Sequence, residues 1–123
     1  MSYLTYRLIH LLGIFTLITA VAAAGTLGLK PREEGDAPRY GAIMIAHACA
    51  LLFIIVAGFG MLARAGLLRE GLPNWVYIKL LIWVMLAAAL SVSRRGPSYA
   101  RLVLVVLPIL ALMAGATAFL KPL

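Results

Sequence analysis

One lysine, Lys79, lies inside a long apolar stretch, and it is the first residue whose surroundings point to chemistry. The stretch reads NWVYIKLLIW from residue 74 to 83 and continues without charge as VMLAAALSVS. Trp75 and Trp83 stand four positions before and after Lys79, which places the three side chains on one face of a helix. An ammonium held between aromatic faces is suited to binding an anion. The plainer interpretation is a lysine whose stem follows the helix until its ammonium reaches the lipid headgroups.

A second candidate, His10, lies in another apolar stretch, and Arg7 shares its helical face three positions earlier. The same face continues through the small and apolar residues Gly13, Leu17, Ala20 and Ala24. Such a composition is typical of a helix face that packs against other membrane helices. We therefore expect His10 to point into a helix bundle. There it bonds to a backbone carbonyl or a hydroxyl group of another helix, or it serves as a haem ligand, a proton relay or part of an anion pocket.

The composition indicates which solvent surrounds these side chains. The chain has 123 residues, of which 64% are hydrophobic and 12% charged, against about 45–50% and about 25% in soluble domains. So small a chain cannot bury this much apolar surface, and a lipid bilayer is the expected surrounding. The net charge of +7 would indicate nucleic acid in a soluble protein. Here the basic residues lie between apolar runs, beside lipid headgroups, so we expect no nucleic-acid partner.

Four apolar runs are long enough to cross a membrane, which takes about 20 helical residues. They cover approximately residues 4–29, 40–65, 75–93 and 99–120, and none shows the alternation of a strand. Short polar connections favour antiparallel neighbours. The sequence therefore predicts one all-α domain, residues 1–123, built as an integral membrane, up-down four-helix bundle. The first run is longer than the apolar part of a signal peptide, so we expect an uncleaved helix.

Helical geometry gives the depth of each candidate in the membrane. At 1.5 Å per residue, Lys79 and His10 both lie about 8–9 Å from the same surface. We therefore predict that they approach each other and share one anion or carboxylate, with Arg7 adding positive charge at the rim. His47 lies about 10 Å from the opposite surface. It is predicted to make a hydrogen bond between helices and not to ligate the same haem as His10.

Small residues four positions apart predict close-packing seams. They lie at Ala42, Ala46 and Ala50 in the second run and at Ala111 and Gly115, alongside Ala114 and Ala118, in the fourth. The apolar runs contain no Asp or Glu, which argues against a proton-coupled pump but not against an anion pathway. Basic residues are divided almost equally between the two sides, so the positive-inside rule gives no orientation.

Two segments, LIHLLGI in the first run and WVYIKLL in the third, carry a family resemblance. They resemble the small bacterial four-helix membrane proteins that include HemJ-type protoporphyrinogen oxidases, CopD-like copper-resistance domains and SirB-like proteins. The turn SRRGPSYAR and the ending FLKPL are most similar to the SirB type. Resemblance to the HemJ type implies that His10 and Lys79 lie near haem b or a porphyrin, with His10 as an axial ligand. The chain lacks the further histidines that this type carries late in the first and third runs.

The sequence thus predicts a small multi-pass protein of the bacterial inner membrane. We expect an accessory or assembly subunit, or a binding module, with a basic pocket formed by His10, Lys79, Arg7, Trp75 and Trp83. A haem-binding or porphyrin-oxidising enzyme is the first alternative, and a channel or carrier formed by oligomerisation is the second. The expected partners are the bilayer and further copies of the chain or a larger membrane complex.

Overall fold

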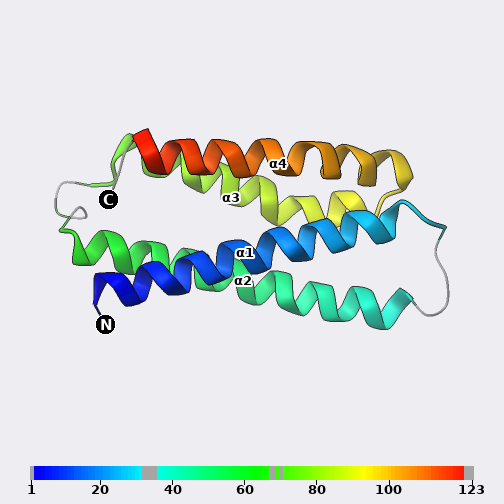
Figure 1. Cartoon of the computed structure of the whole chain (residues 1–123), viewed down its shortest axis with the longest axis horizontal. Helices are drawn as coiled ribbons and strands as arrows, with labels where there is room; N and C mark the ends of the chain where they lie inside the picture. Colours follow the sequence, from blue (N-terminus) through cyan, green and yellow to red (C-terminus); the bar gives the residue numbers. More distant parts are fainter. Residues whose placement is uncertain (1, 32–35, 67–68, 70, 121–123) are drawn as a thin grey trace.

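Four long helices make up the computed structural model, which describes residues 2–31, 36–66, 69 and 71–120. The helices are α1 (Tyr3–Gly28), α2 (Asp36–Arg64), α3 (Asn74–Ser93) and α4 (Pro97–Leu120). Successive helices run in opposite directions, and α1 begins at the end of the bundle where α4 finishes (Figure 1). The predicted all-α, up-down four-helix bundle is confirmed.

The helix bounds differ from the predicted runs where a helix has a polar first turn. Helix α2 begins at Asp36, before the predicted residue 40, and α4 begins at Pro97, before the predicted residue 99. Pro38 and Pro97 both lie in the first turn, where the N–H that proline lacks would have no partner within the helix. Hydropathy alone does not detect such turns. Residues 32–35, 67–68 and 70 of the predicted loops, and 121–123 of the ending, lie outside the described residues.

Each of the four helices is long and apolar enough to cross a membrane. The bundle buries only 22–33% of the apolar window of each helix. Phe15, Ile45 and Leu112 are 65%, 68% and 73% exposed. Soluble proteins rarely expose apolar surface on this scale, so these outward faces are the lipid-contacting surface of a multi-pass membrane protein.

Helix α1 is central, because it packs against the three other helices and most extensively against α2. The predicted inward stripe of α1 is confirmed, since its members Gly13, Leu17, Ala20 and Ala24 are all buried. Leu17 and Val21 are 1% and 0% exposed, and they join a core to which α3 and α4 contribute Ile82, Leu86, Val103, Leu107 and Leu110. The core thus occupies the middle of the bundle and leaves the candidate residues near one end.

Three threonine hydroxyl groups within the helices are satisfied locally. Thr19, Thr26 and Thr117 each donate to the carbonyl oxygen four residues earlier, at 2.8 Å. A polar group without a partner is costly in lipid, and this bond removes the cost within one helix. These threonines therefore need no ligand or neighbouring helix to explain them.

The small-residue seam predicted for α4 does not form within the chain. Gly115 is exposed, and a Cβ added there would meet nothing within 4 Å. Of the small residues predicted there, Ala114 packs against the core, together with the larger residues Val103, Leu107 and Leu110. The seam predicted for α2 packs against other helices at one end only, because Ala50 is buried whereas Ala42 is exposed.

We expect both termini to lie on the same side of the membrane, because four antiparallel spans return the chain to the face where it began. Reporter fusions at residue 1 and residue 123 should give the same topology signal. A reporter inserted after Pro31, between α1 and α2, should give the opposite one and serves as the control. Fusions at the two termini that report opposite faces would rule out four spans.

Candidate functional site

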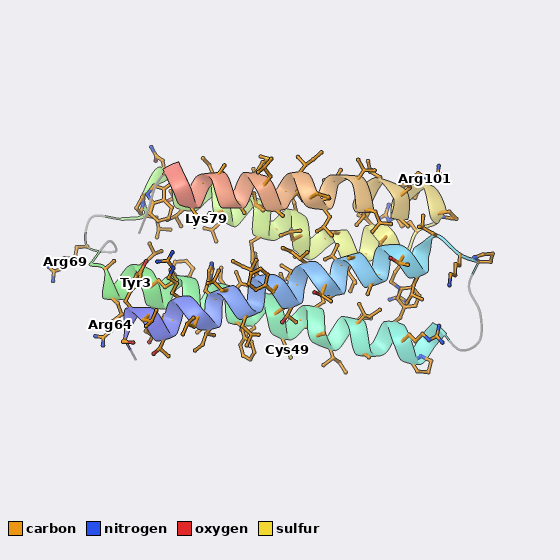
Figure 2. All side chains as sticks on the ribbon, viewed as in Figure 1. Tyr3, Cys49, Arg64, Arg69, Lys79 and Arg101 are labelled. Carbon is orange, nitrogen blue, oxygen red and sulfur yellow. The ribbon has the colours of Figure 1, made fainter. Side chains whose placement is uncertain are left out.

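A partly open cavity of about 80 Å³ lies between α1, α2 and α3. Helix α2 lines it with apolar side chains between Ile54 and Leu62, and α1 contributes His10. Helix α3 contributes Trp75, Lys79 and Trp83, among others. Figure 2 places Lys79 near the end of the bundle where α3 begins, on the side of α3 that faces α1 and α2. The structure therefore brings His10, Lys79, Trp75 and Trp83 to one cavity.

The cavity exists because long side chains, and not close backbone packing, connect α2 and α3. Of the helix pairs that touch, α2 and α3 have the slightest contact. The Trp83 indole N–H donates to the Leu51 carbonyl oxygen at 3.1 Å. His47 Nε2 lies 3.2 Å from the Leu86 carbonyl oxygen, to which it donates. These bonds confirm the interhelical hydrogen bond predicted for His47, and they leave open space beyond Trp83.

His10 reaches across to α2 at a point where a glycine exposes the backbone. Its Nδ1 lies 3.0 Å from the Ile54 carbonyl oxygen. The side chain one turn later normally crowds such a carbonyl, but that residue is Gly58. A Cβ there would stand only 3.3 Å from His10 Cε1. Because a carbonyl only accepts, Nδ1 carries the proton, and Nε2 has no hydrogen-bond partner among the described residues.

Lys79 is half-buried, and its ammonium lies over one of the two predicted aromatic neighbours. Its Nζ is 5.4 Å from the centroid of the Trp75 ring, within the range of a cation–π contact. Trp83 lines the same cavity, but its N–H is bonded to α2. No acidic side chain among the described residues pairs with Lys79. Trp75 therefore restrains the lysine, while Trp83 forms a wall of the cavity.

Arg7 does not line the cavity, although it stands one turn before His10 on α1. Its side chain is exposed near the end of the bundle where α1 begins. Lys79 and His10 line the same cavity near that end. The three basic groups therefore produce a positive potential at this end of the bundle, which favours an anion.

Comparison of the chain with protein-family models, with curated proteins and with solved structures finds no match. The fold and the site define a class: a small multi-pass four-helix bundle with a basic cavity near one end.

The resemblance suggested haem as a cofactor. The orientation of the His10 ring fits a haem ligand, but the volume of the cavity beside it does not fit haem. A histidine whose other ring N–H donates to a carbonyl is oriented as metal-ligating histidines are. The cavity of about 80 Å³, however, is far below the roughly 300–1,000 Å³ of pockets for drug-sized ligands. Haem is at least as large as those ligands, so it does not fit beside His10 as the helices stand. Among the described residues, no group of three or more His, Cys, Asp or Glu is placed to hold a metal ion.

We expect protein purified from its native membrane to lack a Soret absorption band, because the space beside His10 is too small for a macrocycle. Absorption spectroscopy of the protein as purified provides the test. A Soret band that persists in His47→Ala and disappears in His10→Ala would contradict this expectation. That pattern would assign His10, and not His47, as the axial ligand.

Proposed function

We propose that the chain is a membrane-embedded binding module, and an accessory subunit, whose cavity holds one anionic group between Lys79 and His10. One observation carries the proposal. A lysine and a histidine from different helices line one apolar cavity inside the spanning region, and no described acidic side chain neutralises the lysine. A lysine at the centre of a span costs about 2.5–3.5 kcal/mol on insertion scales. A bound anion offsets part of that cost.

The chemistry of the lining supports binding better than catalysis. The described lining contains an ammonium, an imidazole and two indoles, but no carboxylate or thiol to act as a nucleophile. A haem or porphyrin enzyme is less well supported because the cavity is small. A channel or carrier is less well supported because the cavity lies near one end of the bundle.

Two further features support the proposed setting. The resemblance of LIHLLGI and WVYIKLL to small bacterial membrane proteins supports the bacterial inner membrane as the location. The exposed Gly115 on α4 supports association with further copies or with a larger membrane complex, because small residues allow helices to approach closely.

Intrinsic fluorescence tests the proposal, because both tryptophans of the chain line the cavity. Purified protein in an uncharged detergent is titrated with straight-chain carboxylates from acetate to dodecanoate. We expect at least one of them to change the emission saturably, with an apparent affinity about tenfold or more lower in Lys79→Gln, since a charge-assisted hydrogen bond is lost.

Lys30→Gln is the matched control, because Lys30 is an exposed lysine just after the other end of α1. It should titrate as the unmodified protein does. If no carboxylate changes the emission saturably, or if the Lys79 and Lys30 variants behave alike, the cavity is not an anion site.

A further inference from the structure

We infer that the occupant of the cavity is a single-chain amphiphile with a carboxylate head, which enters sideways from the bilayer between α2 and α3. The inference rests on the proposed function, because it names the class of molecule whose anionic group the cavity holds. Three properties of the cavity carry it: the chemistry of its lining, its volume and its position between two helices that barely touch.

The lining is apolar apart from a few nitrogen atoms. Helix α2 contributes only apolar residues, among them Ile55 and Phe59. A free inorganic anion placed there would lose its hydration against surfaces that return no hydrogen bonds. An amphiphile meets the same surfaces with its chain and presents its charge only to Lys79 and His10. The lining therefore matches a molecule with one small polar end.

The volume admits a small polar head. The cavity of about 80 Å³ exceeds the roughly 10–15 Å³ that one water molecule needs, so a carboxylate has room beside Lys79. One carboxylate oxygen accepts from the Lys79 ammonium. The other faces His10 Nε2, which accepts a hydrogen bond from a neutral acid and donates one to a carboxylate once it is protonated.

The position of the cavity gives the chain of the amphiphile a route to the lipid. Phe59 lines the partly open cavity and is 36% exposed within the spanning part of α2, so the proposed entrance lies beside it. Ile55 lies one turn earlier and also lines the cavity. Because α2 and α3 have the slightest contact of any touching pair, the alkyl chain can pass between them along Ile55 and Phe59 without separating packed helices.

The experiment compares three probes on the full chain in nanodiscs of zwitterionic lipid, with tryptophan emission as the readout. Dodecanoate has the head and the chain, acetate has only the head, and dodecanol has only the chain. We expect dodecanoate to saturate the change at a concentration at least about tenfold below that of acetate, because the chain adds apolar contact. Dodecanol should give no saturable change that depends on Lys79.

Two phenylalanines provide matched variants for the path of the chain. Phe59→Ala removes a lining side chain, whereas Phe15→Ala removes one that is 65% exposed on α1 and does not line the cavity. We expect Phe59→Ala to weaken dodecanoate severalfold and by a larger factor than acetate, with Phe15→Ala like the unmodified protein. Circular dichroism establishes that each variant is folded before it is titrated.

The outcomes separate the inference from the proposed function. If acetate matches dodecanoate in a Lys79-dependent manner, the cavity binds a water-soluble carboxylate, so the proposed function holds and the inference fails. If dodecyl phosphate binds more tightly than dodecanoate, the head is a phosphate and the carboxylate assignment is wrong. If dodecanol binds as well as dodecanoate and Lys79→Gln has no effect, the cavity is only an apolar groove and both proposals fail.

Discussion

Replacing Lys79 by methionine should raise the thermal stability of the protein and abolish carboxylate binding at the same time. Methionine keeps an unbranched apolar stem and removes the charge. The change removes an ammonium that lines the same apolar cavity as His10. It also loses the cation–π contact with Trp75, about 0.5–1 kcal/mol.

The sign of the stability change follows from comparing these two effects. A lysine at the centre of a span costs about 2.5–3.5 kcal/mol, and Lys79, near the beginning of α3, bears part of that cost. After subtraction of the lost contact with Trp75, we expect a gain of about 1–2 kcal/mol in the unliganded protein. A residue that lowers stability while it enables binding is typical of a functional site.

Thermal unfolding followed by circular dichroism in detergent measures the first effect, and tryptophan emission with dodecanoate measures the second. Lys30→Met removes an exposed lysine outside the cavity and should change neither result. If Lys79 only reaches the headgroups, its ammonium is already solvated, and we expect Lys79→Met to leave the thermal stability unchanged. Lys79→Met with the stability of the unmodified protein would therefore identify Lys79 as an interfacial anchor and remove the basis for an anion site.

The shared cavity of His10 and Lys79 shows what helical geometry can predict from sequence. The rise per residue is fixed, so the distance of each residue from the end of its apolar run gives its depth. The up-down order then places the first halves of α1 and α3 at the same end of the bundle, as the structure does. Depth and order were therefore sufficient to predict that the two side chains lie near each other.

The contacts that shape the cavity could not be predicted, because they are hydrogen bonds between residues far apart in the chain. Trp83 and His47 bond to backbone carbonyls of the facing helix, and Gly58 exposes the carbonyl that His10 uses. Hydropathy identifies a histidine in a span, but it does not show which carbonyl that histidine reaches.

Sequence also did not predict two further features: whether Arg7 enters the cavity, and which helix packs at Gly115. Arg7 shares a face with His10 in sequence, yet its exposed side chain does not join the lining. Small residues at fourfold spacing indicate that some helix packs closely there. The pattern does not show which helix that is, and no described helix of the chain comes within 4 Å of a Cβ at Gly115.

Gly28→Ala should destabilise the bundle, whereas Gly115→Ala should leave it unchanged or slightly more stable. A Cβ at Gly28 would stand 2.8 Å from the Ala100 Cβ and would overlap the carbonyl oxygen of Ser93. The obstacles include backbone, so the end of α1 must move away from the α3–α4 turn. Overpacking of this kind costs about 1–3 kcal/mol.

Gly115 isolates the backbone effect of the same substitution, because nothing lies within 4 Å of a Cβ there. Alanine is favoured over glycine inside a helix by up to about 1 kcal/mol, and at Gly115 nothing opposes that gain. Thermal unfolding of the two variants in the same detergent should therefore shift the midpoint in opposite directions, or downward for Gly28→Ala alone. The cavity lies at the other end of α1, so folded Gly28→Ala should still respond to dodecanoate. Equal midpoints for the two variants would mean that α1 does not closely approach the α3–α4 turn. The packing of α1 described above, which positions His10, would then be wrong at that end of the helix.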